Sequence, residues 1–256
     1  MPNYMGTKTL LTNVAEPFLK QLIGGKKNWV EPFAGLASMF STLKQKGLVE
    51  HGFLNDANAG TVNMLKQAKD NPEGLIDAVL NKLDKNKETT PLEFMRKLQG
   101  EHPASKLAKA TNEYILTDIA GKAPGIRNSY DRAYKMSNPE KLINKIIQLS
   151  ESLQDADITH GDWKTAMPKF DKNATAMFDP PYVGSHKGKN YGMGTKEALR
   201  LNEQIAEMLR SLPRDKHGLV FNTPKGIDEV YSGIGTKIDF GDIRSTGKVK
   251  QPARYF

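Results

Sequence analysis

The strongest chemical signal in the sequence is the tetrapeptide Asp179-Pro180-Pro181-Tyr182, which follows the apolar run Ala174–Phe178. Because the prolines have fixed φ angles and no N–H to donate, a strand must end at Asp179 and leave as an extended turn. Ligands bind at this carboxyl edge of an open α/β sheet. The Asp179 carboxylate and the Pro180 carbonyl can accept two hydrogen bonds from an amino group, while the Tyr182 ring stacks on a flat heterocycle. For the tetrapeptide alone, a surface turn with Tyr182 packed beside it stays open as an alternative.

Two weaker signals lie nearer the start of the chain. In the loop Glu31–Ser38, Gly35 lets a ligand approach the backbone at the positive end of a helix dipole. No Gly-Lys-Ser/Thr follows, so this is not a phosphate-binding P-loop, and a simple tight turn stays open. Asn55-Asp56 ends the next apolar run, where an acidic group suits ribose hydroxyls. A helix N-cap at Asp56 is the alternative there.

The elements that must position these residues follow from the hydrophobic pattern. Short apolar runs and helical periodicity alternate early and late in the chain, which predicts a doubly wound α/β domain with helices on both faces of its sheet. Between residues 72 and 155 the periodicity is helical almost throughout, and no strand is expected there. The first expected strand starts at Asn28, and the others cover Gly52–Leu54, Ala174–Phe178 and Gly218–Phe221. The expected helices cover Ser38–Lys46, Thr61–Ala68 and Lys196–Leu212.

Taken together, the motifs resemble a known family. Five segments stand in an order that is similar to the Dam-type (class D12, α-group) DNA adenine-N6 methyltransferases, which use S-adenosylmethionine. The resemblance covers roughly residues 1–70 and 157–256. It implies a Rossmann-like methyltransferase sheet from residues 1–71 and 156–256, and a mostly helical target-recognition domain from residues 72–155. The five segments are Tyr4-Met5-Gly6-Thr7-Lys8, Glu31–Ser38, Asn55-Asp56, Gly161-Asp162-Trp163 and Asp179–Tyr182.

The same resemblance implies roles for single residues. It assigns catalysis to Asp179, Pro180 and Tyr182. It assigns cofactor binding to Tyr4, Lys8, Phe33, Gly35, Asp56, Asp162, Trp163 and Asp179. Alternatives stay open for the minor motifs: a core aromatic at Tyr4, a solvated charge at Lys8, and a turn with a buried indole at Trp163. Where the family often has a second glycine in the first loop, this chain has Ala37, which a negative φ would tolerate.

The chemistry expected of this site is methyl transfer to an exocyclic amine. The lone pair of adenine N6 is delocalised into the ring, so hydrogen bonds to the Asp179 carboxylate and the Pro180 carbonyl favour a more tetrahedral, more nucleophilic nitrogen. Stacking on Tyr182 aligns the base with the sulfonium methyl group. No metal is needed, because the leaving group is already a cationic sulfur. A base inside double-stranded DNA must be flipped out to reach such a pocket.

The charge of the chain fits a polyanionic partner. Its 256 residues carry Lys+Arg 37 against Asp+Glu 29, a formal net charge of +8, although solubility alone also explains such an excess. Basic residues around the expected pocket are predicted to bind phosphates, and a polar stretch of the helical insertion is predicted to read bases. A solvated loop, a frayed terminus and a polar helix start are the alternatives. The predicted phosphate contacts are Lys8, Lys187, Lys189, Arg244, Lys248, Lys250 and Arg254. The predicted base contacts are Arg127 and Arg132 at guanine edges, Asn128 at an adenine edge and Tyr130 as a wedge in the base stack.

The sequence excludes some classes of protein and leaves other functions open as alternatives. With no cysteine, disulfides and cysteine-ligated metals are excluded. No run of about eighteen apolar residues and no signal peptide is found, so a cytoplasmic protein is expected. The family resemblance implies a prokaryotic or phage-infected cell. The alternatives are a cytosine-N4 methyltransferase, an RNA methyltransferase and a catalytically silent DNA-binding relic. A monomer or a weak dimer is expected. The Asn- and Gly-rich recognition hairpin of Dam enzymes is not visible, so GATC specificity is not implied.

Overall fold

The computed structural model describes residues 16–119, 139–183, 193–213, 215–242 and 250–256. Within these ranges seven strands form one sheet in the order β3-β2-β1-β4-β5-β7-β6. Strands β1 to β5 run parallel, whereas β7 pairs antiparallel with both β5 and β6. The strands are β1 (Asn28–Glu31), β2 (His51–Asp56), β3 (Ala156–His160), β4 (Ala174–Phe178), β5 (His217–Phe221), β6 (Thr236–Asp242) and β7 (Lys250–Tyr255).

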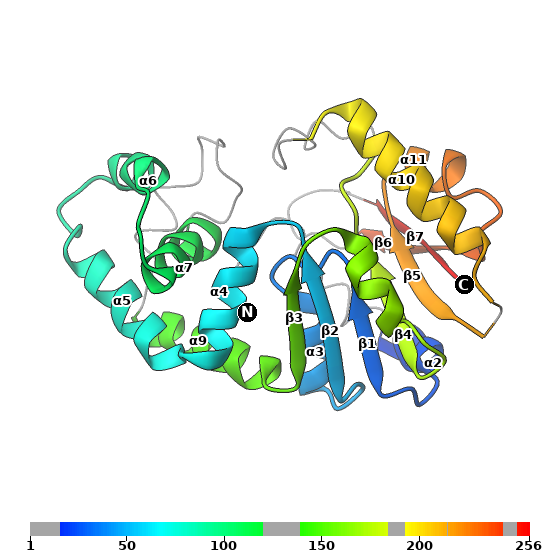
Figure 1. Ribbon diagram of the computed structural model, residues 1–256, viewed down its shortest axis with the longest axis horizontal. Coiled ribbons are helices and arrows are strands. Elements are labelled where there is room, and N and C mark those ends of the chain that lie inside the picture. Colours follow the sequence, from blue (N-terminus) through cyan, green and yellow to red (C-terminus); the bar gives the residue numbers. More distant parts are fainter. Residues whose placement is uncertain (1–15, 120–138, 184–192, 214, 243–249) are drawn as a thin grey trace.

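The order of the strands fixes where a ligand can bind. From β1 the chain moves outward to β2 and β3, and it then returns to β4 on the other side of β1. The loops after β1 and β4 therefore separate at a topological switch point, which is the ligand-binding position of open α/β sheets. In Figure 1 the carboxyl ends of these four strands lie at the same edge.

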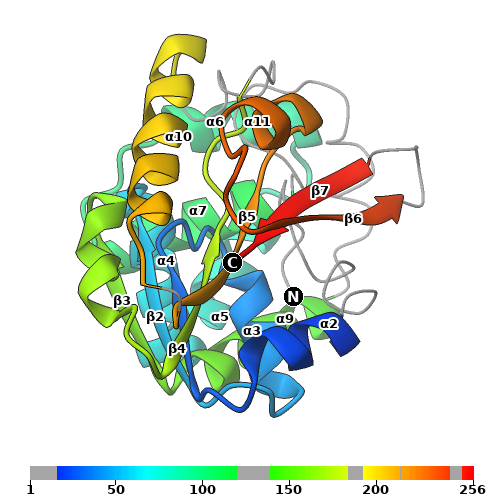
Figure 2. The same ribbon diagram turned by 90° about the vertical axis from the view of Figure 1, so that its right-hand side faces the viewer.

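Helices cover both faces of the sheet, as the sequence predicts (Figures 1 and 2). Adjacent β1 residues point to opposite faces: Trp29 packs in one apolar cluster with α2, α3, α4 and α9, and Val30 in the other with η2, α10 and α11. Both side chains are fully buried. The helices of these two layers are α2 (Glu16–Ile23), α3 (Ser38–Gln45), α4 (Ala59–Asp70), α9 (Pro139–Leu153), the 3₁₀ helix η2 (Trp163–Lys169), α10 (Thr195–Arg210) and α11 (Pro224–Glu229).

All the secondary-structure elements described between β2 and β3 are helices, and they extend the fold to one side (Figure 1). Helices α7 and α9 pack against α4, and the buried side chains of Val79, Phe94 and Tyr114 belong to the same apolar cluster as Trp29. No helix in the described ranges is long and apolar enough to cross a membrane. The further helices of this region are α5 (Pro72–Asp84), α6 (Pro91–Gly100), α7 (Lys106–Tyr114) and the π-helix η1 (Ile115–Ile119).

The predicted elements are confirmed to within a few residues. Strand β4 has the bounds that the sequence predicts, because Pro180 and Pro181 end it. Helix α4 begins earlier than predicted, at Ala59, because Asn58 caps it by accepting hydrogen bonds from the backbone N–H groups of Gly60 and Thr61.

Candidate active site

The Asp179–Tyr182 turn leaves the carboxyl end of β4, directly beside β1. The Tyr182 hydroxyl donates a hydrogen bond to Asp179 Oδ1 at 3.0 Å. Pro180 is buried, while Asp179 and Tyr182 are partly exposed. The ring and the carboxylate are thus held together across the two prolines, and both remain accessible to a ligand.

Glu31, the last residue of β1, is fully buried. Its Oε1 accepts hydrogen bonds from Trp29 Nε1 at 2.7 Å and from the Phe40 backbone N–H at 2.8 Å. Its Oε2 has no hydrogen-bond partner within the part of the chain that the structure describes. Burial raises the pKa of Glu31 to about 8, the two bonds oppose the rise, and the nearby charge of Asp179 adds to it. The sequence placed Glu31 in the first loop motif but gave no sign of its burial.

The first loop departs from the sequence-based expectation at Ala37. From the sequence, an alanine is expected to be tolerated at this position if its φ is negative. Ala37 instead has φ 52° and ψ 32°, in the left-handed region. Gly35 in the same loop has φ 51°. Ala37 is the N-cap of α3 and makes no side-chain capping bond, so the Glu31 carboxyl group, by accepting from the Phe40 N–H, serves the helix start instead. Burial of the Ala37 side chain offsets part of the backbone strain.

Asp56 is joined to the first loop. Its Oδ2 accepts from the Gly35 N–H at 2.8 Å, and its Oδ1 accepts from the Asn58 N–H at 2.8 Å. Burial raises the pKa of Asp56, and the backbone hydrogen bonds oppose that rise. The N-cap interpretation of Asp56 is wrong, because Asn58 caps α4 while Asp56 ends β2 and turns its carboxylate to the neighbouring loop.

Asn55, near the end of β2, connects the loops that follow the two neighbouring strands. Its amide nitrogen donates to the carbonyls of Pro32, Gly161 and Asp162 at 3.0–3.3 Å. Its amide oxygen accepts from the hydroxyls of Thr159 and Thr165 at 3.0 and 2.9 Å, and the side chain is 1% exposed. A buried amide with this many partners holds the loops after β1 and β3 in one arrangement. The sequence motif contained Asn55 without assigning it a role.

Aromatic and polar groups of the loop after β3 face the first loop. The rings of Phe33 and Trp163 stack with centroids 6.4 Å apart and an interplanar angle of 25°. Trp163 is 5% exposed, which agrees with the buried-indole alternative, whereas Phe33 is partly exposed. Asp162 is exposed and caps η2 by accepting from the Lys164 N–H at 2.9 Å. The structure therefore brings Phe33, Gly35, Asp56, Asp162, Trp163, Asp179, Pro180 and Tyr182 to the carboxyl ends of β1 to β4.

Comparison with known proteins agrees with this arrangement. A family model of the D12 class N6 adenine-specific DNA methyltransferases matches residues 4–239. The chain belongs to this family. The Type II methyltransferase M1.LlaDCHI of Lactococcus lactis subsp. cremoris is 26% identical to this D12-class methyltransferase over 200 residues, which cover 74% of this chain and 69% of that protein. Family membership confirms the predicted adenine-N6 DNA methyltransferase and its Rossmann-like α/β fold.

Of the residues predicted to bind DNA, Lys250 and Arg254 lie within the described part of the D12-class methyltransferase. Lys250 begins β7, and nothing is described of its side chain. The Arg254 guanidinium donates to the carbonyls of Ile227, Ile234 and Gly235 at 3.2–3.5 Å, so it supports the contact between β7 and α11. The predicted residues outside the described ranges are Tyr4, Lys8, Arg127, Asn128, Tyr130, Arg132, Lys187, Lys189, Arg244 and Lys248.

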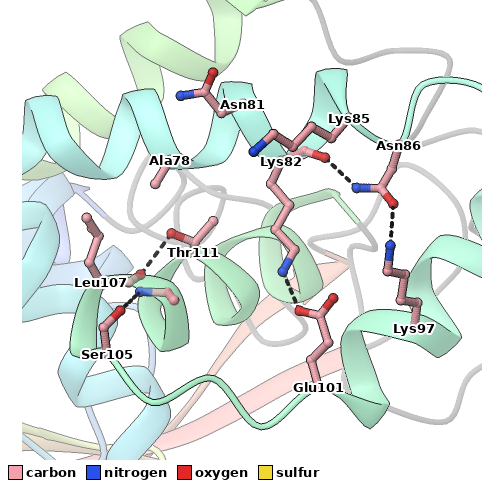
Figure 3. A pocket seen from close by; sticks show the side chains of 11 residues that line it. Ala78, Asn81, Lys82, Lys85, Asn86, Lys97, Glu101, Ser105, Leu107 and Thr111 are labelled. Carbon is pink, nitrogen blue, oxygen red and sulfur yellow. Dashed lines mark hydrogen bonds and ion pairs between the residues drawn. The ribbon is translucent and has the colours of Figure 1, made fainter.

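A separate cavity of about 470 Å³ lies among α5, α6 and α7 of the methyltransferase (Figure 3). It is lined by residues between 78 and 111, which include none of the motif residues. Two polar contacts cross it: Lys82 forms an ion pair with Glu101, and Lys97 Nζ donates to the Asn86 amide oxygen at 3.1 Å. These contacts join α5 to α6, so we interpret the cavity as part of the helical packing rather than as the site of chemistry.

Proposed function

We propose that this methyltransferase binds S-adenosylmethionine at the carboxyl ends of β1, β2 and β3 and methylates N6 of an adenine flipped out of double-stranded DNA. The observation that carries the proposal is that the described motif residues lie together at one topological switch point of the sheet. Asp56 and the ring pair of Phe33 and Trp163 lie on one side, and the Asp179–Tyr182 turn lies next to them across the β1–β4 pair.

The residues present fit the cofactor. A carboxylate oxygen has two acceptor sites, so Asp56 can accept ribose hydroxyls while it keeps its bonds to the Gly35 and Asn58 amides. Phe33 offers an accessible aromatic face, and Asp162 offers an exposed carboxylate beside it. Gly35, Tyr4 and Lys8 complete the proposed set. S-adenosylmethionine supplies a methyl group bonded to a positively charged sulfur, which needs no metal to leave.

The chain's own residues then act on the target base. Asp179 and the Pro180 carbonyl accept hydrogen bonds from N6, and the carboxylate stabilises the positive charge that develops on this nitrogen. The Tyr182 ring, fixed by its bond to Asp179, stacks on the base and limits its rotation. Cytosine N4 is a second exocyclic amine that the same acceptors fit, but family membership favours adenine.

DNA is proposed to lie across the carboxyl edge of the sheet. Lys187, Lys189, Arg244, Lys248 and Lys250 would bind phosphates and fix the register of the duplex. We propose residues 1–71 and 156–256 as the catalytic domain and residues 72–155 as the target-recognition domain, with Arg127, Asn128 and Arg132 reading base edges and Tyr130 wedging into the base stack. The cytoplasmic location and the monomeric or weakly dimeric state stay predictions.

Two measurements test this function. Purified protein is incubated with double-stranded DNA and S-adenosylmethionine, and the digested nucleosides are analysed by mass spectrometry. N6-methyladenine is the expected product, whereas N4-methylcytosine alone, or methylation of RNA only, would contradict the proposal. Isothermal titration with S-adenosylmethionine excludes the silent-relic alternative if binding heat is seen, and an Asp56→Ala variant should bind at least 10-fold more weakly.

A further inference from the structure

A pair of buried asparagines holds the far side of the Asp179–Tyr182 turn. Asn222, directly after β5, accepts a hydrogen bond from the Val183 backbone N–H at 3.0 Å through its Oδ1. The same oxygen accepts from the Thr223 N–H at 2.9 Å, and the Thr223 hydroxyl donates to the Val183 carbonyl at 2.9 Å. Both backbone polar groups of Val183 are therefore bound by the segment that follows β5.

The second asparagine reaches the turn from helix α10. Asn202 Nδ2 donates to the Pro181 carbonyl at 2.9 Å and to the Ala198 carbonyl at 2.7 Å. Asn202 Oδ1 accepts from Asn222 Nδ2 at 2.7 Å and from the Tyr231 hydroxyl at 2.6 Å. Both protons of the Asn202 amide and both of its acceptor positions are thus used, which fixes its orientation.

The network is completely enclosed. Asn202, Asn222 and Tyr231 are each 0% exposed, and burial raises the pKa of Tyr231, so its hydroxyl stays protonated as a donor. A Cβ added to Gly226 would overlap Asn222 Oδ1, so the first turn of α11 packs directly on the amide. Polar groups buried this deeply are costly unless they are satisfied, and a satisfied network allows one arrangement only.

We propose that Asn202 and Asn222 are positioning residues for methyl transfer. Pro180 and Pro181 cannot donate hydrogen bonds, so the turn depends on bonds from outside its own backbone. The Pro181 carbonyl and the Val183 N–H belong to the two peptide groups that flank Tyr182, so the pair fixes the direction of Tyr182 relative to the Pro180–Pro181 turn. The proposal rests on the proposed roles of Asp179, Pro180 and Tyr182 in binding the amino group.

The test compares isosteric and control variants in single-turnover methyl transfer at saturating DNA and S-adenosylmethionine. Asn202→Asp keeps the side-chain volume and the acceptors for Asn222 and Tyr231 but replaces the donor to Pro181 by an oxygen. Tyr231→Phe removes one hydrogen bond from the same network and leaves both bonds to the turn in place. We expect the rate constant to fall at least 10-fold in Asn202→Asp and to stay within 3-fold in Tyr231→Phe, with cofactor Kd unchanged within 3-fold in both.

A second readout does not depend on activity. Hydrogen exchange of the peptide that contains Val183 should speed up at least 10-fold in Asn222→Ala, but not in Asn86→Ala, a buried asparagine of the helical region. If wild-type protein transfers no methyl group, the proposed function fails, and the exchange data still decide whether the pair holds the turn. Equal rate constants in Asn202→Asp and Tyr231→Phe, or unchanged exchange in Asn222→Ala, would overturn the positioning role. Should Asn222→Ala not fold, Gly226→Ala, which displaces the same amide, replaces it.

Discussion

The Tyr182 hydroxyl donates to Asp179 Oδ1 at 3.0 Å, across the two prolines between them. This bond couples the residue proposed to bind the amino group with the ring proposed to stack on the base. The orientation of each residue therefore depends on the other. Substitution of Tyr182 can separate the contribution of its hydroxyl to methyl transfer from that of its ring.

Removing the Tyr182 hydroxyl tests the coupling. A hydrogen bond to a charged group contributes about 1.5–3 kcal/mol, and loss of the ring removes a further ~1–3 kcal/mol of base stacking. We expect Tyr182→Phe to lower the single-turnover rate constant by roughly 10-fold, and Tyr182→Ala by more than about 100-fold. Equal losses in the two variants would show that the ring contributes nothing.

Glu31 should make stability depend on pH. Its pKa is about 8 in the folded protein and near 4.5 when unfolded, so the folded state retains a proton that the unfolded state releases. The contribution of the neutral carboxyl group is complete below pH 4.5 and is lost as pH rises through 8. Urea unfolding from pH 5 to 8.5 should show wild type losing on the order of 4 kcal/mol relative to Glu31→Gln, since one pKa unit is about 1.4 kcal/mol. Parallel pH profiles would contradict this assignment.

Ala37 is strained but buried, so two effects compete. The left-handed φ of 52° costs an L-residue about 1–2 kcal/mol, and glycine would relieve this strain. Glycine also destabilises in two ways: it loses the burial of the methyl group, about 0.8 kcal/mol, and it increases the conformational entropy of the unfolded chain. We therefore expect Ala37→Gly to change the free energy of unfolding by less than ~1 kcal/mol. Ala37→Val should destabilise by about 2 kcal/mol or more, because β-branched residues rarely adopt this conformation. Denaturant titration measures both values, and a tolerated valine would be inconsistent with the left-handed backbone.

The basic segment after the turn is predicted to bind phosphate. The double reversal Lys187→Glu and Lys189→Glu should weaken DNA binding and reduce the slope of log K against log salt by about 0.9 for each lost contact. Lys172→Glu is the control, since Lys172 is exposed and precedes β4 at the opposite edge of the sheet. An unchanged slope in the double variant, or an equal effect in the control, would argue against this DNA path.

The sequence predicted those parts of the structure that depend on local chemistry. Consecutive prolines end β4 at the predicted residue, and the apolar run Leu219–Phe221 marks β5 correctly to within one residue. The buried polar contacts could not be predicted this way. Asn202 forms hydrogen bonds with Pro181, 21 positions away in the chain, and with Asn222, 20 positions away. Such long-range pairs leave no periodic pattern in the sequence. Nothing in the sequence marks Ala37 as left-handed, because its conformation is imposed by the loop between Glu31 and α3.

The central claim is that Asp179 binds the amino group that receives the methyl. It is tested most directly by measuring tritiated-methyl transfer and DNA affinity on the same Asp179→Ala preparation. We predict transfer to fall at least 100-fold, equivalent to about 2.7 kcal/mol or more of transition-state stabilisation, while the Kd for DNA changes less than about 3-fold. Turnover close to wild type in a folded Asp179→Ala variant would contradict the account.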